Sequence, residues 1–382
     1  MKLGIDRFLQ SEYTRVKGKR VGLVSNLTGV NQHLEPSIDL LHQHPDVNLV
    51  SLYAPEHGIR GDAKEGEQID SSTDPHTGLP VFSLYGETRK PTPDMLANVD
   101  VLLFDLQDIG SRYYTYIYTM AYVMEACGEN DISLIILDRP NPSGGLHVEG
   151  NLVEEAFRSF VGLLPITNCH GMTVAELAGL FQTEFGYTCD LDIVKMEGWS
   201  REMYYDDTGL AWVPPSPNAP SLDMALLYPG TCLLEGTNVS EGRGTTKPFE
   251  QFGAPYMDGY TLAKEINALQ LPGVMARQAS FVPTYQKYDS EQCHGIQLHL
   301  IDRDVYKPVS NGIKIIHRIA QLYPNDFAFV ESSNGRFMFD LLAGTDTLRN
   351  AIKKDNLSSY FSESTKETAA FLKQRAPYLL YQ

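Results

Sequence analysis

The sequence predicts an α/β protein in which a mostly parallel sheet domain is followed by a smaller α+β domain. Apolar runs alternate with helical patterns through the first half of the chain, which is typical of parallel strands covered by helices. The chain has 382 residues, which favours more than one domain. A proline-rich segment at 212–220 then interrupts the alternation, because proline cannot donate the amide hydrogen bond of a helix or a sheet.

The elements of the first domain follow from the same patterns. We expect strands at 20–25, 47–54, 80–84, 99–105, 133–138 and 190–196, with helices at 35–44 and 112–127. Ser111 can cap the helix at 112–127. Thr173 and Glu176 have the spacing of a capping box, which predicts a further helix that ends near Phe185.

We place the domain boundary near 226, so that residues 1–226 form the sheet domain and residues 227–382 form the smaller domain. In the smaller domain we expect helices at 259–269 and 312–323, strands at 281–285 and 295–301, and a short helical tail. Because helices and strands do not alternate regularly there, the pattern favours an α+β arrangement.

The composition excludes several classes of partner. The formal net charge of −17 argues against nucleic acid, because phosphate binding requires clustered lysine and arginine. No apolar run reaches the ~20 residues of a membrane span, and the N-terminal residues lack the apolar core of a signal peptide. We therefore expect no membrane partner and a cytoplasmic protein, or a secreted or periplasmic one if a signal peptide has been removed.

Cysteine and glycine patterns narrow the choice of cofactor. The five cysteines are scattered and form no C-x-x-C pair, which indicates reduced thiols rather than a disulfide framework or a zinc site. The first predicted strand is not followed by G-x-G-x-x-G, and the chain contains no P-loop motif. We therefore expect no nucleotide cofactor.

Polar residues cluster where three of the predicted strands end. Side chains at the carboxyl edge of a parallel sheet face a ligand crevice, so we expect the three clusters to converge there. Neighbouring carboxyl groups shift each other's pKa values, so that one can act as an acid while another stays ionised. The candidates are Glu56, His57 and Arg60 after the second strand, Asp105, Gln107, Asp108, Arg112 and Tyr113 or Tyr114 after the fourth, and Asp138 and Asn141 after the fifth.

Two loops add further candidates. His170 precedes the cap at Thr173 and could bind ligand or orient an acid. The loop at 234–248 is rich in glycine, which lets backbone approach a ligand closely. Its polar candidates are Glu235, Asn238, Glu241, Arg243 and Lys247, of which Arg243 or Lys247 would supply the cation that an acidic substrate needs. Helix caps, ion pairs and a mobile surface loop are the structural alternatives for these residues.

A metal site is the rival explanation for part of this set. His57, Asp105, Asp108 and His170 are of residue types that bind metal ions. The chain contains no H-E-x-x-H or similarly compact signature, so we expect no metal.

The same positions carry motifs that resemble those of the NamZ-type peptidoglycan exo-β-N-acetylmuramidases. The motifs are Ala-Pro-Glu-His-Gly-Ile-Arg-Gly at 54–61, Phe-Asp-Leu-Gln-Asp-Ile-Gly-Ser-Arg-Tyr-Tyr-Thr-Tyr at 104–116, Asp-Arg-Pro-Asn-Pro at 138–142, His-Gly-Met-Thr at 170–173 and Glu-Gly-Thr-Asn-Val-Ser-Glu-Gly-Arg-Gly-Thr at 235–245. They follow one another in order through nearly the whole chain.

The resemblance implies a Rossmann-like N-terminal domain, a smaller C-terminal domain and an active cleft between them. It also implies a bacterial enzyme of cell-wall turnover and recycling, without metal or nucleotide. The implied reaction is hydrolysis that releases N-acetylmuramic acid from the non-reducing end of a peptidoglycan fragment. Glu56 matches the proposed catalytic glutamate of the family.

Glycoside hydrolysis commonly requires one carboxylic acid to protonate the leaving oxygen and a second group at the anomeric carbon. We expect Glu56 to be the acid/base, tuned by His57 or Arg60. Glu241, Asp108 and Glu235 compete for the second role, and attack by the acetamido group of the substrate is a further route.

The lactyl carboxylate of muramic acid calls for a cation, with Arg60, Arg112 and Arg243 as candidates. Two other hypotheses remain for the whole chain. One is a metal-dependent hydrolase of another muropeptide bond, and the other is a non-catalytic protein that binds muramic sugar.

Overall fold

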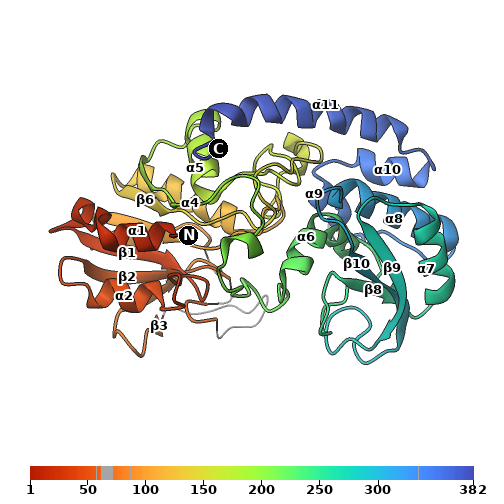
Figure 1. The fold of residues 1–382 in the computed structure, drawn as a ribbon, viewed down its shortest axis with the longest axis horizontal. Coiled ribbons are helices and arrows are strands. Elements are labelled where there is room, and N and C mark those ends of the chain that lie inside the picture. Colours follow the sequence, from red (N-terminus) through yellow and green to blue (C-terminus); the bar gives the residue numbers. More distant parts are fainter. Residues whose placement is uncertain (57, 62–71, 87, 334) are drawn as a thin grey trace.

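A computed structural model describes residues 1–56, 58–61, 72–86, 88–333 and 335–382 of the chain. The molecule consists of a larger part with a seven-stranded sheet and a smaller part with a three-stranded antiparallel sheet. The two parts lie side by side along the longest axis (Figure 1). This architecture confirms the predicted fold class.

The larger sheet is parallel except at one edge, where β3 pairs antiparallel with β4. Its strand order is β3-β4-β2-β1-β5-β6-β7. The strands are β1 (Arg20–Ser25), β2 (Asn48–Ala54), β3 (Ser72–Thr73), β4 (Pro80–Ser83), β5 (Val101–Asp105), β6 (Ser133–Leu137) and β7 (Asp190–Val194). All six strands predicted in this half are confirmed, and the carboxyl ends of β1, β2, β4, β5, β6 and β7 share one edge.

Helices cover both faces of this sheet. Val101 and Leu103 of β5 belong to an apolar cluster with α1 and α2, whereas Leu102 and Phe104 belong to a cluster with α4 and α5. Alternate side chains of a strand point to opposite faces, so this run of consecutive apolar residues is buried on both sides. The helices are α1 (Gly4–Gln10), α2 (Ser37–Gln43), α3 (Pro93–Leu96), α4 (Tyr116–Glu129) and α5 (Val174–Glu184), with short 3₁₀ turns η1 (Glu12–Val16), η2 (Glu155–Phe157) and η3 (Asp206–Thr208).

The capping box predicted for α5 is confirmed, but the predicted start of α4 is wrong. Thr173 Oγ1 accepts a hydrogen bond from the amide of Glu176 at 3.3 Å. By contrast, α4 begins at Tyr116, and Ser111 does not cap it. The segment before the helix instead pairs with the backbone of a distant loop, where the amide of Arg112 donates to the carbonyl of Asn168 at 2.8 Å. That pairing holds residue 112 outside a helix.

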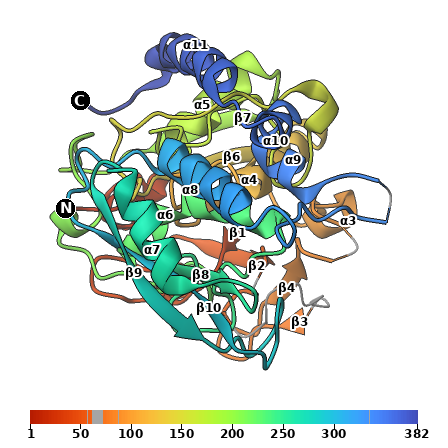
Figure 2. The same ribbon diagram turned by 90° about the vertical axis from the view of Figure 1, so that its right-hand side faces the viewer.

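The smaller part begins with α6 (Leu222–Thr231) and η4 (Cys232–Gly236). Its sheet has the order β8-β10-β9, with β8 (Gln251–Ala254), β9 (Val274–Phe281) and β10 (Cys293–Leu300). Figure 2 shows α7 (Gly259–Ala268) against these strands, while α8 (Pro308–Leu322) packs against α6 and α7. The strand predicted at 281–285 is wrong, since β9 ends at Phe281. In β9, exposed positions such as Arg277 lie between buried ones. The strand therefore has no continuous apolar run in the sequence.

The C-terminal tail is longer than predicted and returns to the larger part. It contains α9 (Met338–Ala343), α10 (Thr347–Lys353), the 18-residue helix α11 (Ser358–Arg375) and η5 (Ala376–Tyr378). Figure 1 shows α11 crossing above both parts. Tyr378 then donates a hydrogen bond to Glu184 at 2.6 Å, and Tyr381 donates one to Asp138 at 2.5 Å. No helix among the described residues combines the length and apolar character that crossing a bilayer demands.

A buried guanidinium group connects the two parts. Arg112 is 0% exposed, and its Nη1 donates to the carbonyls of Asn151 and Ile166, the latter at 2.9 Å. Its Nη2 donates to the carbonyls of Leu342 and Ala343 at 3.1 and 2.9 Å. Arg112 therefore satisfies four backbone oxygens from the larger part and from α9, and it has a structural position rather than one in a crevice.

Replacing Arg112 with Met is expected to destabilise the fold, because the carbonyls lose a charged donor inside the protein. We expect the free energy of unfolding to fall by on the order of 4 kcal/mol in a urea titration followed by circular dichroism. Arg20→Ala is the matched control, since Arg20 pairs with Asp100 at the surface and should matter far less. Equal losses in the two variants would show that Arg112 does not hold the parts together.

Candidate active site

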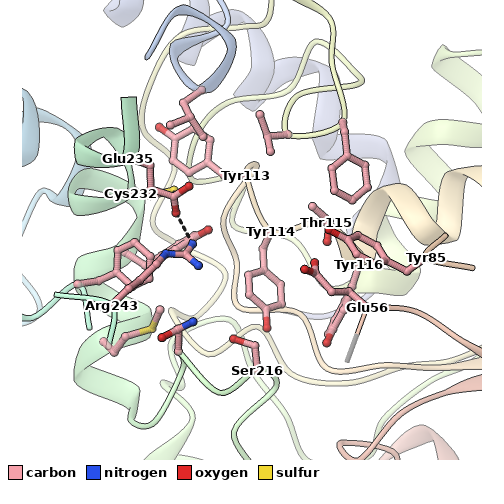
Figure 3. A pocket seen from close by; sticks show the side chains of 17 residues that line it. Glu56, Tyr85, Tyr113, Tyr114, Thr115, Tyr116, Ser216, Cys232, Glu235 and Arg243 are labelled. Atoms are coloured by element: carbon pink, nitrogen blue, oxygen red, sulfur yellow. Dashed lines mark hydrogen bonds and ion pairs between the residues drawn. The ribbon is translucent and has the colours of Figure 1, made fainter. Parts of the chain in front are cut away.

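A pocket of about 170 Å³ lies between the two parts of the molecule (Figure 3). The segments after β2, β4 and β5 line it from the larger part, and α6, η4 and the following loop line it from the smaller part. Its residues are Glu56, Tyr85, Tyr113, Tyr114, Thr115, Tyr116, Phe160, Val161, Ser216, Asn218, Met224, Tyr228, Cys232, Glu235, Arg243, Phe249 and Leu342. The carboxyl edge of the parallel sheet thus supplies part of the pocket, as expected for such sheets.

Glu56 lies two residues beyond the end of β2, among tyrosines. Burial, the negative charge of Glu56 and a hydrogen bond to Glu56 together raise the pKa of Tyr85 to about 12. Burial, and then the charge of Glu56, also raises the pKa of Tyr116. Figure 3 shows Glu56 next to Tyr116 and Tyr85 on one side of the pocket. The phenol groups are therefore neutral, and the hydroxyl of Tyr85 is the donor in its hydrogen bond to Glu56.

A cluster of carboxylates and cations faces Glu56 from the smaller part. Glu235 Oε1 lies 2.6 Å from Arg243 Nη2, and Glu241 Oε1 lies 3.2 Å from Arg243 Nε. Glu241 Oε2 lies 2.9 Å from Lys287 Nζ. Figure 3 shows Glu235 and Glu56 on opposite sides of the pocket. The pocket therefore has a carboxyl group on each side, each contributed by a different part of the molecule.

The surroundings of the cluster shift the pKa values of Glu235 and Arg243. Burial, followed by the charge of Glu241, raises the pKa of Glu235, while Lys287 opposes the shift. Burial lowers the pKa of Arg243 to about 10, which still leaves the guanidinium charged at neutral pH. With Glu56 included, there are three carboxyl groups and two cations, so an extra proton is most easily held at Glu235, whose pKa is raised.

Aromatic rings form much of the remaining wall. The ring centroids of Tyr113 and Tyr228 are 6.3 Å apart, and those of Tyr228 and Phe249 are 4.8 Å apart, both edge to face. Such rings offer apolar faces with polar hydroxyl groups, a combination that suits the mixed surface of a sugar. Sequence reasoning missed Tyr228 and Phe249. It also missed Tyr85, although this residue follows β4 at the sheet edge where the other candidates were sought.

Of the predicted site residues, the pocket brings together Glu56, Tyr113, Tyr114, Glu235 and Arg243, with Glu241 directly behind them. Asn168 donates a hydrogen bond to the hydroxyl of Tyr113, which in turn contacts the carbonyl of Pro229 at 3.3 Å. His57 lies outside the described residues. Lys247 pairs with Glu250 at 2.8 Å and does not line the pocket.

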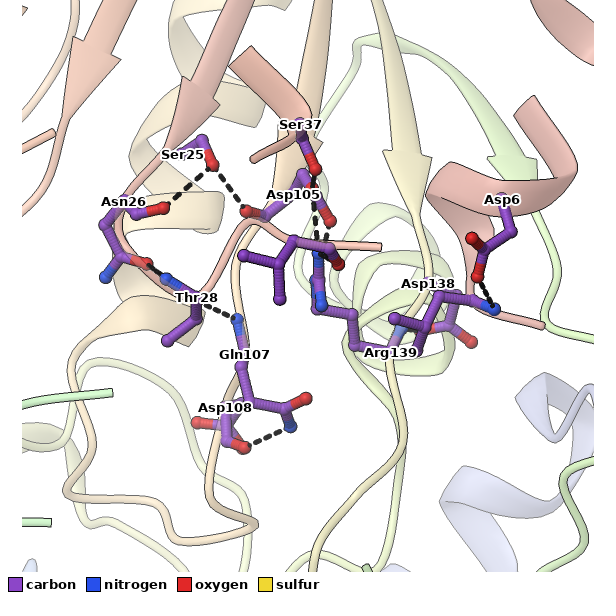
Figure 4. A network of polar contacts seen from close by, with 12 residues as sticks. Asp6, Ser25, Asn26, Thr28, Ser37, Asp105, Gln107, Asp108, Asp138 and Arg139 are labelled. Atoms are coloured by element: carbon purple, nitrogen blue, oxygen red, sulfur yellow. Dashed lines mark hydrogen bonds and ion pairs between the residues drawn. The ribbon is translucent and has the colours of Figure 1, made fainter. Parts of the chain in front are cut away.

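The aspartates at the ends of β5 and β6 take part in buried structural contacts (Figure 4). Asp105 accepts hydrogen bonds from Arg139 Nε at 2.6 Å and from Ser37 Oγ at 2.6 Å. Asp138 accepts from Thr173 Oγ1 at 2.8 Å and from the amide of Ala175 at 3.0 Å. Burial raises the pKa of the Asp138 carboxyl to about 7.

Gln107, Asp108, Asn141 and His170 occupy the same buried region rather than the pocket. Gln107 Nε2 donates to the carbonyl of Pro140 at 2.7 Å, and Asn141 Nδ2 donates to the carbonyl of Met172 at 3.0 Å. Asp108 Oδ2 lies 3.4 Å from His170 Nε2, and both side chains are buried. None of the four is among the residues that line the pocket.

Arg60 and Asn238 also have partners elsewhere. Arg60 binds Asp74 at 2.8 Å and Asp39 at 2.8 Å, which engages two edges of its guanidinium group. Asn238 Nδ2 donates to the carbonyl of Asp326 at 2.7 Å, within the smaller part. In the described part of the chain, no three His, Cys, Asp or Glu side chains gather in a group that could hold a metal ion.

Comparison with known proteins gives a consistent result over the whole chain. The family model described as "Exo-beta-N-acetylmuramidase NamZ, N-terminal" matches residues 21–223, and its C-terminal counterpart matches residues 226–381. The chain is 50% identical to the peptidoglycan β-N-acetylmuramidase NamZ of Bacillus subtilis, over 100% of this chain and 91% of that protein.

Two crystal structures of DUF1343 family proteins from Bacteroides fragilis have the same fold. One has a TM-score of 0.93 with 40% identity, and the other a TM-score of 0.80 with 31% identity. Each comparison covers 100% of this chain and 99% of the other. The full-length matches confirm the resemblance seen in the sequence motifs, and the chain belongs to the NamZ exo-β-N-acetylmuramidase family.

Proposed function

We propose that this protein is an exo-acting glycosidase that releases N-acetylmuramic acid from the non-reducing end of peptidoglycan fragments, in cell-wall turnover and recycling. The full-length relationship to a peptidoglycan β-N-acetylmuramidase supports this activity. The observation that carries the chemistry is the placement of Glu56 and Glu235 on opposite sides of one pocket. Two carboxyl groups that flank a scissile bond are the usual requirement of glycoside hydrolysis.

The surroundings of the two glutamates divide their roles. Glu235, whose pKa is raised by burial and by Glu241, is suited to hold a proton and deliver it to the glycosidic oxygen. Glu56 accepts a hydrogen bond from Tyr85, which orients its carboxyl group on the other side of the pocket. We therefore assign the proton donor to Glu235 and action at the anomeric carbon to Glu56. This assignment reverses the roles expected from the sequence, where Glu56 was the acid.

The cluster behind Glu235 keeps it in place for this role. Arg243 holds the carboxyl group of Glu235 at 2.6 Å while sharing its charge with Glu241. We propose that Arg243 and Glu241 act as positioning residues. Of the three arginines considered for binding the lactyl carboxylate, Arg60 and Arg112 are engaged elsewhere, and Arg243 lies between two glutamates.

We also propose that the reaction proceeds without a metal ion. The two glutamates supply the proton donor and the group at the anomeric carbon, so hydrolysis requires no Lewis acid. A metal-dependent hydrolase of another muropeptide bond is the alternative that a chelator test separates from this proposal.

The division of roles predicts how two variants respond to the leaving group. Glu235→Gln should lose about 100-fold or more in kcat/KM on the muramic acid–glucosamine disaccharide, and much less on a muramide with an acidic phenol leaving group, which departs without protonation. Glu56→Gln should lose roughly 1000-fold on both substrates. Glu125→Gln, at the surface beside Lys90, is the control. The opposite pattern would return the donor role to Glu56, and undiminished turnover would remove a glutamate from the mechanism.

Removing the charge of Glu241 should shift the pH profile in a defined direction. That charge raises the pKa of Glu235, so Glu241→Gln should lower it. Activity that depends on protonated Glu235 is lost as the pH rises through its pKa. We therefore expect the alkaline limb of the kcat/KM profile to move to lower pH in Glu241→Gln. An alkaline limb that stays at the same pH, or that moves to higher pH, would contradict the assignment of Glu235 as the acid.

Removal of metal ions should leave the activity intact. The wild-type enzyme is dialysed against EDTA and transferred into metal-free buffer. We expect it to hydrolyse a chromogenic N-acetylmuramide at the same rate as the untreated enzyme. Loss of activity that added divalent ions restore would instead support the metal-dependent alternative.

A further inference from the structure

We propose that Arg89 forms an outer binding position for a carboxylate at the edge of the pocket, where it recognises the anionic part of the substrate. The inference rests on the proposed function, because it names which group of that substrate is bound. Arg89 was not among the residues predicted from the sequence.

The position of Arg89 follows from its stacking on a pocket residue. The guanidinium carbon lies 3.5 Å from the ring centroid of Phe160, which lines the pocket. The ring of Phe160 lies 6.1 Å from that of Tyr85, and Tyr85 is hydrogen-bonded to Glu56. A continuous row of contacts therefore leads outward from Glu56 to Arg89.

The charge of Arg89 is exposed and, within the described residues, has no carboxylate partner. Its neighbour Lys90 differs, since it pairs with Glu125 at 3.0 Å and with Glu129 at 2.9 Å. Stacking on an aromatic ring restrains the guanidinium plane but leaves its N–H groups at the edge available. The guanidinium group of Arg89 is therefore restrained, and the N–H groups along its edge can donate two parallel hydrogen bonds to the two oxygens of a carboxylate.

The acidic surroundings explain why a cation is needed at this place. Glu56, Glu235 and Glu241 give the pocket and its wall three carboxyl groups, which disfavour the approach of an anion. Arg243 is shared by two of these glutamates, and Lys287 is bound to Glu241 and to three backbone carbonyls. The inner cations are thus already opposed by protein groups, whereas the exposed charge of Arg89 lies beside Phe160 of the pocket wall.

Two carboxylates of the substrate have the required chemistry. One is the lactyl group of the terminal muramic acid that is released. The other belongs to a second muramic acid, beyond the glucosamine of the leaving part. Three substrates separate them: a chromogenic N-acetylmuramide and the muramic acid–glucosamine disaccharide carry only the first, whereas a trisaccharide that ends in a second muramic acid carries both.

The test is steady-state kinetics of Arg89→Ala, Arg89→Lys and the control Lys90→Ala on the three substrates. We expect Arg89→Ala to raise KM about tenfold with little change in kcat, and Arg89→Lys to fall between it and the wild type, because lysine keeps the charge but not the fork. Added salt should raise KM of the wild type more than that of Arg89→Ala, because only the wild type retains the screened attraction.

The pattern across substrates assigns the bound group. A rise in KM on all three identifies the lactyl carboxylate of the terminal sugar, and a rise confined to the trisaccharide identifies the carboxylate of the leaving part. KM values equal to those of Lys90→Ala on every substrate, or a loss in kcat alone, would overturn the role of Arg89 while the activity itself stands. A wild-type enzyme inactive on all three would overturn the proposed function and this inference with it.

Discussion

The buried guanidinium group of Arg112 is the contact on which the rest of the molecule depends. It satisfies backbone carbonyls from a loop of the larger part and from α9 of the smaller part, in a place that water does not reach. The apolar cluster on the α4 and α5 side of the sheet also continues into the smaller part. Glu56 and Glu235 come from different parts, so these contacts set how they face each other.

Charge is distributed within the site so that each group has a distinct state. Lys287 and Arg243 compensate Glu241 from two sides, which allows a carboxylate to remain buried behind the pocket. Glu235 is closer to the cavity, where burial and its neighbour disfavour a second negative charge. The tyrosines near Glu56 stay neutral and serve as donors. One cavity therefore holds two carboxyl groups in different surroundings, as acid and base chemistry at one pH requires.

Local patterns in the sequence predicted much of the fold, because buried parallel strands and a capping box are written in neighbouring residues. The same strand-end rule led to Glu56. It could not separate Glu56 from Asp105 and Asp138, which also follow strands, because their partners Ser37, Arg139 and Tyr381 lie far away in the sequence. The start of α4 was misplaced for the same reason. Only the folded chain reveals which polar groups are already satisfied.

The return of the chain to the larger part has a consequence for the order of folding. Asp138 and Glu176 belong to the larger part, yet they receive hydrogen bonds from Tyr381 and from the amide of Leu380. During synthesis on the ribosome, the sheet of the larger part emerges some 200 residues before these donors, so its buried polar contacts are completed only after the smaller part has been made. The last polar contacts of the larger part therefore form only when the C-terminal tail has been synthesised and has returned to it.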